Sequence, residues 1–309
     1  MTTSPEAAPA ISLQSVTKTF GSKRAVSSVS FEVQAGQCYG LIGPNGAGKT
    51  TLFSMMCGFL HPTEGSLHIL GANPSKPGAL KGKVGILPQD ALLPARWAVG
   101  ELLTYWAKLS HLDDPRGEAK RALQCVQLGE VWDVAAGTLS HGMAKRVALA
   151  QALMGSPPVL LFDEPTAGLD PKIAAAIRNL IADLKGRHTI VVSSHNLHEL
   201  EELCDGTAIL DRGQLVRSAS IAEITQQAEE FRVRIARGEV PLDEIRAFSE
   251  CRGARLEGNS VLCVEFDGAS IAAENIITRV VALLAARHVL MLEVWRGKRL
   301  EDAVLKLTH

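Results

Sequence analysis

The hydrophobic positions of the chain follow two patterns that predict different elements. Short apolar runs between Gly and Pro turns predict β-strands near the start of the chain. These runs are Ile11–Leu13, Ser30–Val33, Cys38–Ile42 and Ser66–Leu70. Apolar residues at helical spacing, such as Val99, Leu102 and Leu103, then predict a helical segment over about residues 91–155.

Strands and helices alternate again after this segment. Val159–Phe162 and Thr189–Ser193 are continuous apolar runs of the kind found in doubly covered parallel strands, and Ile173–Leu184 between them is amphipathic. A hairpin is expected around Asp211-Arg212-Gly213. This alternation predicts an α/β fold whose sheet is at least partly parallel.

The pattern changes once more after about residue 220. The order strand, helix, two strands, helix, strand predicts a small α+β ferredoxin-like domain, followed by a last helix. The predicted elements are Phe231–Ala236, Leu242–Glu250, Ala254–Phe266 with a turn at Glu257-Gly258-Asn259, Ala272–Arg287, Leu290–Trp295 and Arg299–Leu307. We therefore expect a disordered tail over residues 1–10, a main domain over 11–220 and an accessory domain over 221–309.

Composition agrees with two domains and narrows the class of protein. A length of 309 residues suggests about two domains, and 46% hydrophobic with 21% charged residues indicates a globular chain with a sizeable core. The net charge of −1 argues against a surface dedicated to nucleic acid. No apolar run reaches the roughly 18 residues of a membrane span. The six cysteines include no CxxC pair, which predicts free thiols in the cytoplasm.

A phosphate-binding loop is the strongest chemical signal. Residues 43–50 fit the pattern GxxxxGK[ST], after an apolar strand and before a helix that begins around Lys49. Glycines let successive amides point inward at an anion, Lys49 is expected to contact the β- and γ-phosphates, and Thr50 to bind Mg²⁺. The predicted cofactors are therefore ATP and Mg²⁺. The nucleotide-binding residues predicted here are Gly43, Pro44, Asn45, Gly46, Ala47, Gly48, Lys49, Thr50 and Thr51.

Two carboxylates end a later apolar strand. Asp163 is expected to hold Mg²⁺, and Glu164 to polarise the water that attacks the γ-phosphate. A solvated acidic turn is the alternative interpretation, and the phosphate loop argues against it.

With these motifs, residues 11–218 resemble the nucleotide-binding subunit of an ATP-binding-cassette (ABC) transporter. The resemblance implies that Phe20 stacks on adenine and that Gln89 contacts Mg²⁺ and links the sheet to the helical subdomain. His195, after a β-branched strand, matches the histidine that senses the γ-phosphate. Asp170, in Ala167-Gly168-Leu169-Asp170, matches the loop that crosses the family's dimer.

Leu139-Ser140-His141-Gly142-Met143 resembles the family's signature, whose usual form is LSGGQ. Ser140 and Gly142 match the usual signature and are expected at a helix N-terminus, which would face the γ-phosphate of the ATP bound by the other subunit. Met143 replaces a glutamine and His141 a glycine. His141 either tunes the contact with the other subunit through its charge or points to solvent.

The resemblance also implies a mechanism and partners. Two copies, or this chain and a homologous ATPase subunit, would sandwich two ATP molecules, with Lys49, Glu164 and His195 as catalytic residues. The chain would lie on the inner face of the cell membrane and drive a separate permease in export. Ala91–Trp106 is the predicted permease contact, with plain burial in the helical subdomain as the alternative. Leu300–Leu307 resembles the ending of ABC-2 exporter subunits, which suggests a regulatory or dimer-stabilising C-terminal domain.

Two other functions fit less well. A related ATPase acting on DNA or the ribosome would carry coiled coils, zinc modules or a second cassette, and the sequence has one cassette without heptads or CxxC. A phosphate-loop kinase would explain neither the signature nor His195.

Overall fold

The computed structural model describes residues 8–90, 92–225, 230–258, 260–266, 272–297 and 299–307. The chain divides into two compact units, of which the first ends at Ser218 and the second spans Ala219–Leu307. Ala10 is buried and its amide donates to Val33 O, so the expectation of a disordered tail is wrong for this residue. Residues 1–7 of the expected tail, Ala91 of the expected permease contact and Asn259 of the expected turn lie outside the described residues.

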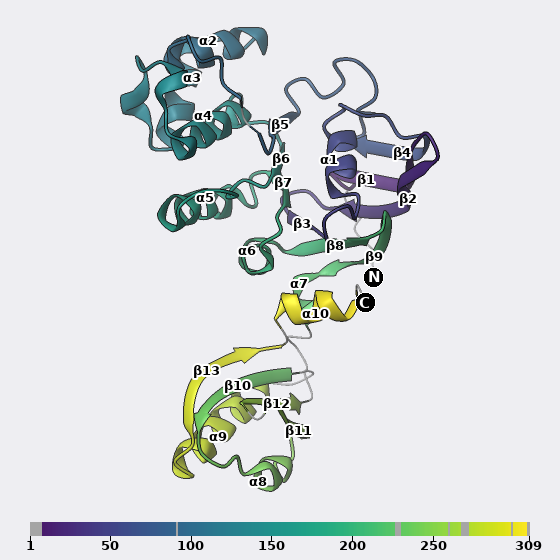
Figure 1. The fold of residues 1–309 in the computed structure, drawn as a ribbon, viewed down its shortest axis with the longest axis vertical. Helices are drawn as coiled ribbons and strands as arrows, with labels where there is room; N and C mark the ends of the chain where they lie inside the picture. Colours follow the sequence, from purple (N-terminus) through teal and green to yellow (C-terminus); the bar gives the residue numbers. More distant parts are fainter. Residues whose placement is uncertain are drawn as a thin grey trace, which may run out of the picture. The chain divides into compact units, whose positions relative to one another are not determined.

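A six-stranded sheet in the order β5-β6-β7-β3-β8-β9 forms the centre of the first unit (Figure 1). The pairs β5–β6, β6–β7, β7–β3 and β3–β8 are parallel, which confirms the partly parallel sheet. Every residue of β3, β6 and β7 is buried, as continuous apolar runs require. The bounds are β3 Cys38–Ile42, β5 Val84–Leu87, β6 Val159–Asp163, β7 Thr189–Ser193, β8 Gly206–Asp211 and β9 Gln214–Ser220.

A smaller antiparallel sheet, β2-β1-β4, holds the strands at the start of the chain. They are β1 Ile11–Phe20, β2 Lys23–Val33 and β4 Glu64–Ile69, and the first two are longer than predicted. The reason is irregular pairing: the β1–β2 register shifts three times, and Ser15 and Ser28 both adopt φ 50°. Such bulges break the alternation of apolar and polar residues that marks a strand in a sequence.

The helices of the first unit pack on these sheets or gather in a separate group. Figure 1 shows α2, α3 and α4 together, between β5 and β6 in the chain. Helix α1 contributes Leu52, Phe53, Met55 and Met56 to one core with residues of both sheets. The bounds are α1 Lys49–Met56, α2 Val99–Leu109, α3 Pro115–Cys125, α4 His141–Leu153, α5 Pro171–Leu184 and α6 Leu197–Leu203. None of the described helices is long and apolar enough to cross a membrane.

From β10 onward the second unit follows the predicted order of elements, whereas α7, which precedes β10, was not predicted. Its antiparallel sheet runs β11-β12-β10-β13. The predicted helix Leu242–Glu250 is wrong beyond Arg246, because residues 247–250 form turns that lead into β11. The bounds are α7 Ile221–Thr225, β10 Glu230–Arg237, α8 Leu242–Arg246, β11 Cys251–Glu257, β12 Val261–Phe266, α9 Ala272–Ala286, β13 Leu290–Arg296 and α10 Leu300–Leu307.

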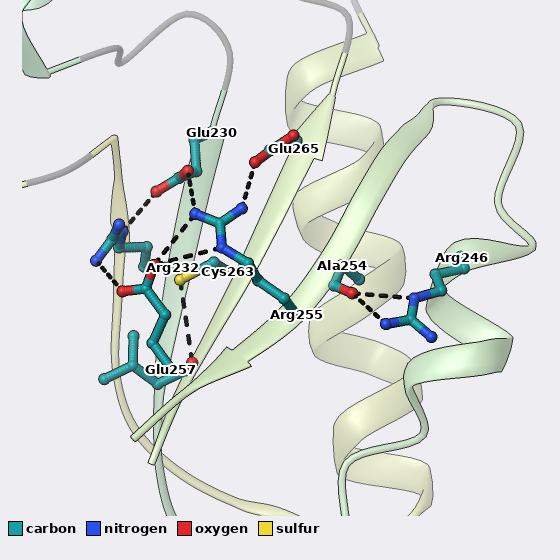
Figure 2. A network of polar contacts seen from close by, with 9 residues as sticks. Glu230, Arg232, Arg246, Ala254, Arg255, Glu257, Cys263 and Glu265 are labelled. Atoms are coloured by element: carbon teal, nitrogen blue, oxygen red, sulfur yellow. Dashed lines mark hydrogen bonds and ion pairs between the residues drawn. The ribbon is translucent and has the colours of Figure 1, made fainter. Parts of the chain in front are cut away.

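An ion-pair network joins β10, β11 and β12 in the sheet of the second unit, as Figure 2 shows. Arg232 Nε lies 2.6 Å from Glu230 Oε1, and its Nη1 lies 3.1 Å from Glu257 Oε2. Arg255 reaches Glu230, Glu257 and Glu265. The side chains of Glu230 and Arg232 are only 3% and 5% exposed, so their charges depend on these partners for compensation.

Gly85 on β5 fixes how closely α4 approaches the sheet. A Cβ at this position would lie 1.9 Å from Ala152 O of α4, a backbone atom that cannot move aside. We therefore expect Gly85→Ala to lower the free energy of unfolding by about 2 kcal/mol, as overpacked cores do. Denaturant titration measures this change. Gly129→Ala is the matched control, because a Cβ there meets nothing within 4 Å, and equal stability of the two variants would contradict the expectation.

Candidate functional site

The loop between β3 and α1 requires glycine at two points for steric reasons. A Cβ on Gly43 would lie 2.3 Å from Leu210 O of β8. A Cβ on Gly48 would lie 2.7 Å from Ala25 O, and Gly48 also adopts φ 101°. The loop therefore passes close to two neighbouring backbones before α1 begins at Lys49. The free amides at this helix N-terminus favour an anion.

Lys49 bends back over the loop. Its Nζ donates to Gly43 O and, at 3.2 Å, to Pro44 O. Burial lowers the pKa of Lys49, and the carboxylates of Glu164 and Asp163 act in the opposite direction. A partly desolvated ammonium group beside an anion-binding loop is well placed to exchange these carbonyls for phosphate oxygens.

A cleft of about 800 Å³ opens beside the loop. It brings together residues that are far apart in the sequence, from the ends of β3, β5, β6 and β7. The predicted residues that line it are Asn45, Gly46, Ala47, Gly48, Lys49, Thr50, Thr51, Gln89, Asp163, Glu164 and His195. Gly43 and Pro44 belong to the same loop without lining the cleft.

Ser193, at the end of β7, holds both carboxylate-bearing residues. Its hydroxyl donates to Asp163 Oδ1 and accepts from the Glu164 amide at 3.1 Å. The Glu164 amide also donates to Ser193 O at 3.1 Å. These bonds matter because Glu164 adopts φ 49°, a left-handed conformation that costs a non-glycine residue about 1–3 kcal/mol.

Glu164 and His195 are hydrogen bonded to each other. His195 Nδ1 lies 2.8 Å from Glu164 Oε2, and the Glu164 side chain is 12% exposed while that of His195 is 70% exposed. A carboxylate that accepts from Nδ1–H fixes the orientation of the imidazole ring. The pair can therefore serve proton transfer and stabilise negative charge in the cleft.

The oxygen donors of the cleft fit Mg²⁺. Thr50, Gln89 and Asp163 offer a hydroxyl, an amide oxygen and a carboxylate, which are the hard ligands this ion prefers. Mg²⁺ commonly binds through one or two carboxylates together with phosphate oxygens, and the phosphate loop lies in the same cleft.

Four residues that were predicted to bind nucleotide lie outside both the phosphate loop and the lining of the cleft. Phe20 is 47% exposed at the β1–β2 turn, and Lys18 Nζ lies 5.2 Å from the centroid of its ring. Lys23, which pairs with Phe20 across the two strands, does line the cleft. Ser140 and Asp170 cap helices: Ser140 Oγ accepts from Met143 N at 3.3 Å, and Asp170 Oδ1 accepts from two amides of α5.

Gly142, the fourth of these residues, lies where α4 meets α5. A Cβ on Gly142 would lie 2.7 Å from Ile173 Cδ1, the end of a flexible side chain, which would have to shift to accept a larger residue. His141 is exposed, and its Nε2 lies 3.5 Å from where a Cβ on Gly168 would stand. Its imidazole therefore lies beside the segment that leads to Asp170.

Six further residues line the cleft without having been predicted as site residues: Lys23, Arg24, Ala25, Ala167, Ser193 and Arg212. Lys23 and Arg24 follow the turn after Phe20, and Arg212 occupies the turn between β8 and β9. No spacing rule links these positions to the phosphate loop. Their positive charges add to the attraction of the cleft for phosphates.

Comparisons with known proteins agree on one family. A family model described as "ABC transporter" matches residues 26–167. The chain is 32% identical over 305 residues to the "Nod factor export ATP-binding protein I" of Burkholderia lata, covering 96% of each chain. It is 34% identical over 221 residues to the "Uncharacterized ABC transporter ATP-binding protein YxlF" of Bacillus subtilis, covering 71% of this chain and 74% of that one.

Solved structures show the same fold for the first unit. A "Dimeric structure of a post-hydrolysis state of the ATP-binding cassette MJ0796 bound to ADP and Pi" superposes with a TM-score of 0.63 at 25% identity, covering 68% of this chain and 98% of that one. A nucleotide-free cassette from an ABC transporter gives a TM-score of 0.61 at 26% identity, covering 69% and 92%. The expected P-loop cassette fold is confirmed.

Ser193→Ala removes the donor to Asp163 and one acceptor of the Glu164 amide. We expect the free energy of unfolding to fall by about 2 kcal/mol, because buried polar groups lose their partners. Thermal or denaturant unfolding measures the loss. Ser12→Ala is the control, because the Ser12 hydroxyl makes only an exposed contact of 3.4 Å with Glu32. A Ser193→Ala protein as stable as this control would show that the hydroxyl does not hold the two residues.

Proposed function

Because the chain belongs to the ATP-binding subunits of ABC transporters, we propose that it hydrolyses ATP to ADP and phosphate as one half of a dimer and drives a separate membrane permease in export. The observation that carries the proposal is the shared cleft of Lys49, Thr50, Asp163, Glu164 and His195. Relatives that are named export ATP-binding proteins support the direction of transport.

Each residue has a role that its surroundings support. Lys49 contacts the β- and γ-phosphates, and Thr50, Gln89 and Asp163 hold Mg²⁺, which neutralises phosphate charge when bound. Glu164 accepts a proton from the attacking water, and its left-handed backbone directs the side chain from the strand end to the cleft. His195 stabilises the charge on the transferred phosphoryl group.

The residues outside the cleft belong to the dimer in this proposal. Ser140 and Gly142 begin α4, whose N-terminal amides and dipole favour the γ-phosphate of the partner's ATP. Asp170 follows the segment that would cross to the partner. A dimeric cassette with ADP and phosphate among the structural relatives supports this arrangement.

Exposed apolar side chains on α2 and on the segment before it support a permease contact. Trp97 and Tyr105 are 41% and 47% exposed with ring centroids 5.3 Å apart, and Leu92 is 91% exposed. Aromatic residues are enriched at protein interfaces, and these three side chains remain partly or largely exposed. Through this contact the chain is proposed to lie at the inner face of the membrane. The second unit is proposed to regulate or stabilise the dimer.

Glu164→Gln keeps the size of the side chain and removes its basicity. We expect ATP hydrolysis to fall by about 100-fold or more while ATP still binds and closes the dimer. Phosphate release measures the rate, and light scattering after gel filtration in Mg²⁺ and ATP measures the dimer. Glu130→Gln changes an exposed carboxylate and serves as control. Turnover retained in Glu164→Gln would remove Glu164 from this role.

Trp97→Ala should weaken association with the permease, because truncating a buried aromatic anchor commonly costs more than 1 kcal/mol of binding energy. We expect copurification with a candidate permease, a membrane protein encoded by a neighbouring gene, to fall by about fivefold or more. Phe59→Ala is the control, since Phe59 is 68% exposed and follows α1 outside this surface. Equal copurification of both variants would place the permease contact elsewhere.

A further inference from the structure

Glu199 on α6 is a buried carboxylate that the proposed function does not use. The residue is 8% exposed. Its Oε2 accepts from Thr166 Oγ1 at 2.6 Å and from Ser194 Oγ at 3.5 Å, and its Oε1 accepts from Arg178 Nη1 at 2.9 Å. A carboxylate at this depth persists only when it is paired and hydrogen bonded, and these three donors supply both conditions.

The donors come from three separate segments. Thr166 lies in the loop after β6, two residues after Glu164 and four before Asp170. Ser194 directly precedes His195 in the loop after β7, and Arg178 lies on α5. The Glu199 carboxylate therefore connects the loop of Glu164 with the loop of His195. Through Arg178 it also connects both loops to α5.

The two loops are thus connected twice. The bond between Glu164 Oε2 and His195 Nδ1 faces the cleft, and it must be exchanged when each side chain engages water or phosphate. The bonds of Glu199 to Thr166 and Ser194 are buried, so they can persist through that exchange. Two loops that are joined by buried hydrogen bonds keep their spacing while the reactive side chains in the cleft change partners.

Resting on the proposed function, we propose that Glu199 is a positioning residue: through Thr166 and Ser194 it holds the loop of Glu164 and Asp170 in register with the loop of His195. The fixed register would also couple the segment proposed to cross the dimer with the residue that senses the γ-phosphate. A change at Glu199 or Thr166 then acts on the rate of hydrolysis and leaves the phosphate loop, hence ATP affinity, intact.

The test uses the full chain and the hydroxyl of Thr166. Thr166→Val removes the donor at nearly constant shape, and Thr166→Ser restores it. We expect kcat to fall about tenfold in Thr166→Val and to stay within about twofold of wild type in Thr166→Ser, with ATP affinity within about twofold in both. Glu199→Gln should lower kcat similarly. A kcat unchanged in Thr166→Val, or equally low in Thr166→Ser, overturns the proposal.

Amide hydrogen exchange gives a readout that is independent of activity. Thr166→Val should accelerate exchange in both segments 164–170 and 193–197, because the shared partner is lost. Glu118→Gln is the matched control: Glu118 accepts from Arg121 and from the Gly155 amide, and neither partner lines the cleft. In Glu118→Gln, amide exchange should accelerate only near Arg121 and Gly155. Acceleration confined to the Thr166 segment would contradict the coupling.

Ser194→Ala provides a second route should Thr166→Val fail to fold, since it removes the other hydroxyl that reaches Glu199. It should accelerate exchange in segment 164–170, which contains neither Ser194 nor Glu199, and normal exchange there overturns the proposal. A wild-type chain that hydrolyses no more ATP than Glu164→Gln overturns the proposed function, whereas an active wild type with an equally active Thr166→Val overturns only the role of Glu199.

Discussion

The parallel register of β3, β7 and β6 is the constraint on which the candidate site depends. Ser193 is paired with Leu41 on one side and with Asp163 on the other. Three strands therefore end at one level, and the carboxyl ends of parallel strands are where open α/β sheets bind ligands. Because all three strands are fully buried, sliding one of them by a residue would displace apolar side chains as well as catalytic ones.

Hydrogen bonds at this edge prepare the site before any substrate binds. Ser193 fixes Asp163 and the backbone of Glu164, the loop carbonyls retain Lys49, and Glu164 orients His195. Groups held in place in this way need little reorganisation when charge develops, which is a major source of catalytic power. The unfavourable backbone angle of Glu164 is offset by the same hydrogen bonds that position it.

The sequence predicted those parts of the structure that follow from local spacing. The phosphate loop is contiguous, and β3 and β7 have the predicted bounds because they are unbroken apolar runs. Bulged β1 and β2 were predicted too short, since their apolar positions lose alternation near Ser15 and Ser28.

Contacts between distant segments could not be read from spacing. Lys23, Arg24 and Arg212 reach the cleft through two turns on different sheets, so nothing in the sequence relates them to the phosphate loop. Glu199 lies on α6, a helix of seven residues. The sequence alone does not distinguish this buried glutamate from a solvent-exposed one. Tertiary packing supplies this information.

The ion-pair network of the second unit has a consequence for how this protein can change over time. Glu230 and Arg232 are buried and paired with each other, and each has one further partner on β11, so replacing either one alone removes the closest partner of the other buried charge. Replacing the group together by apolar residues of similar volume carries no such penalty. These positions are therefore expected to vary in concert across descendants of this chain, with intermediates that carry one substitution being disfavoured.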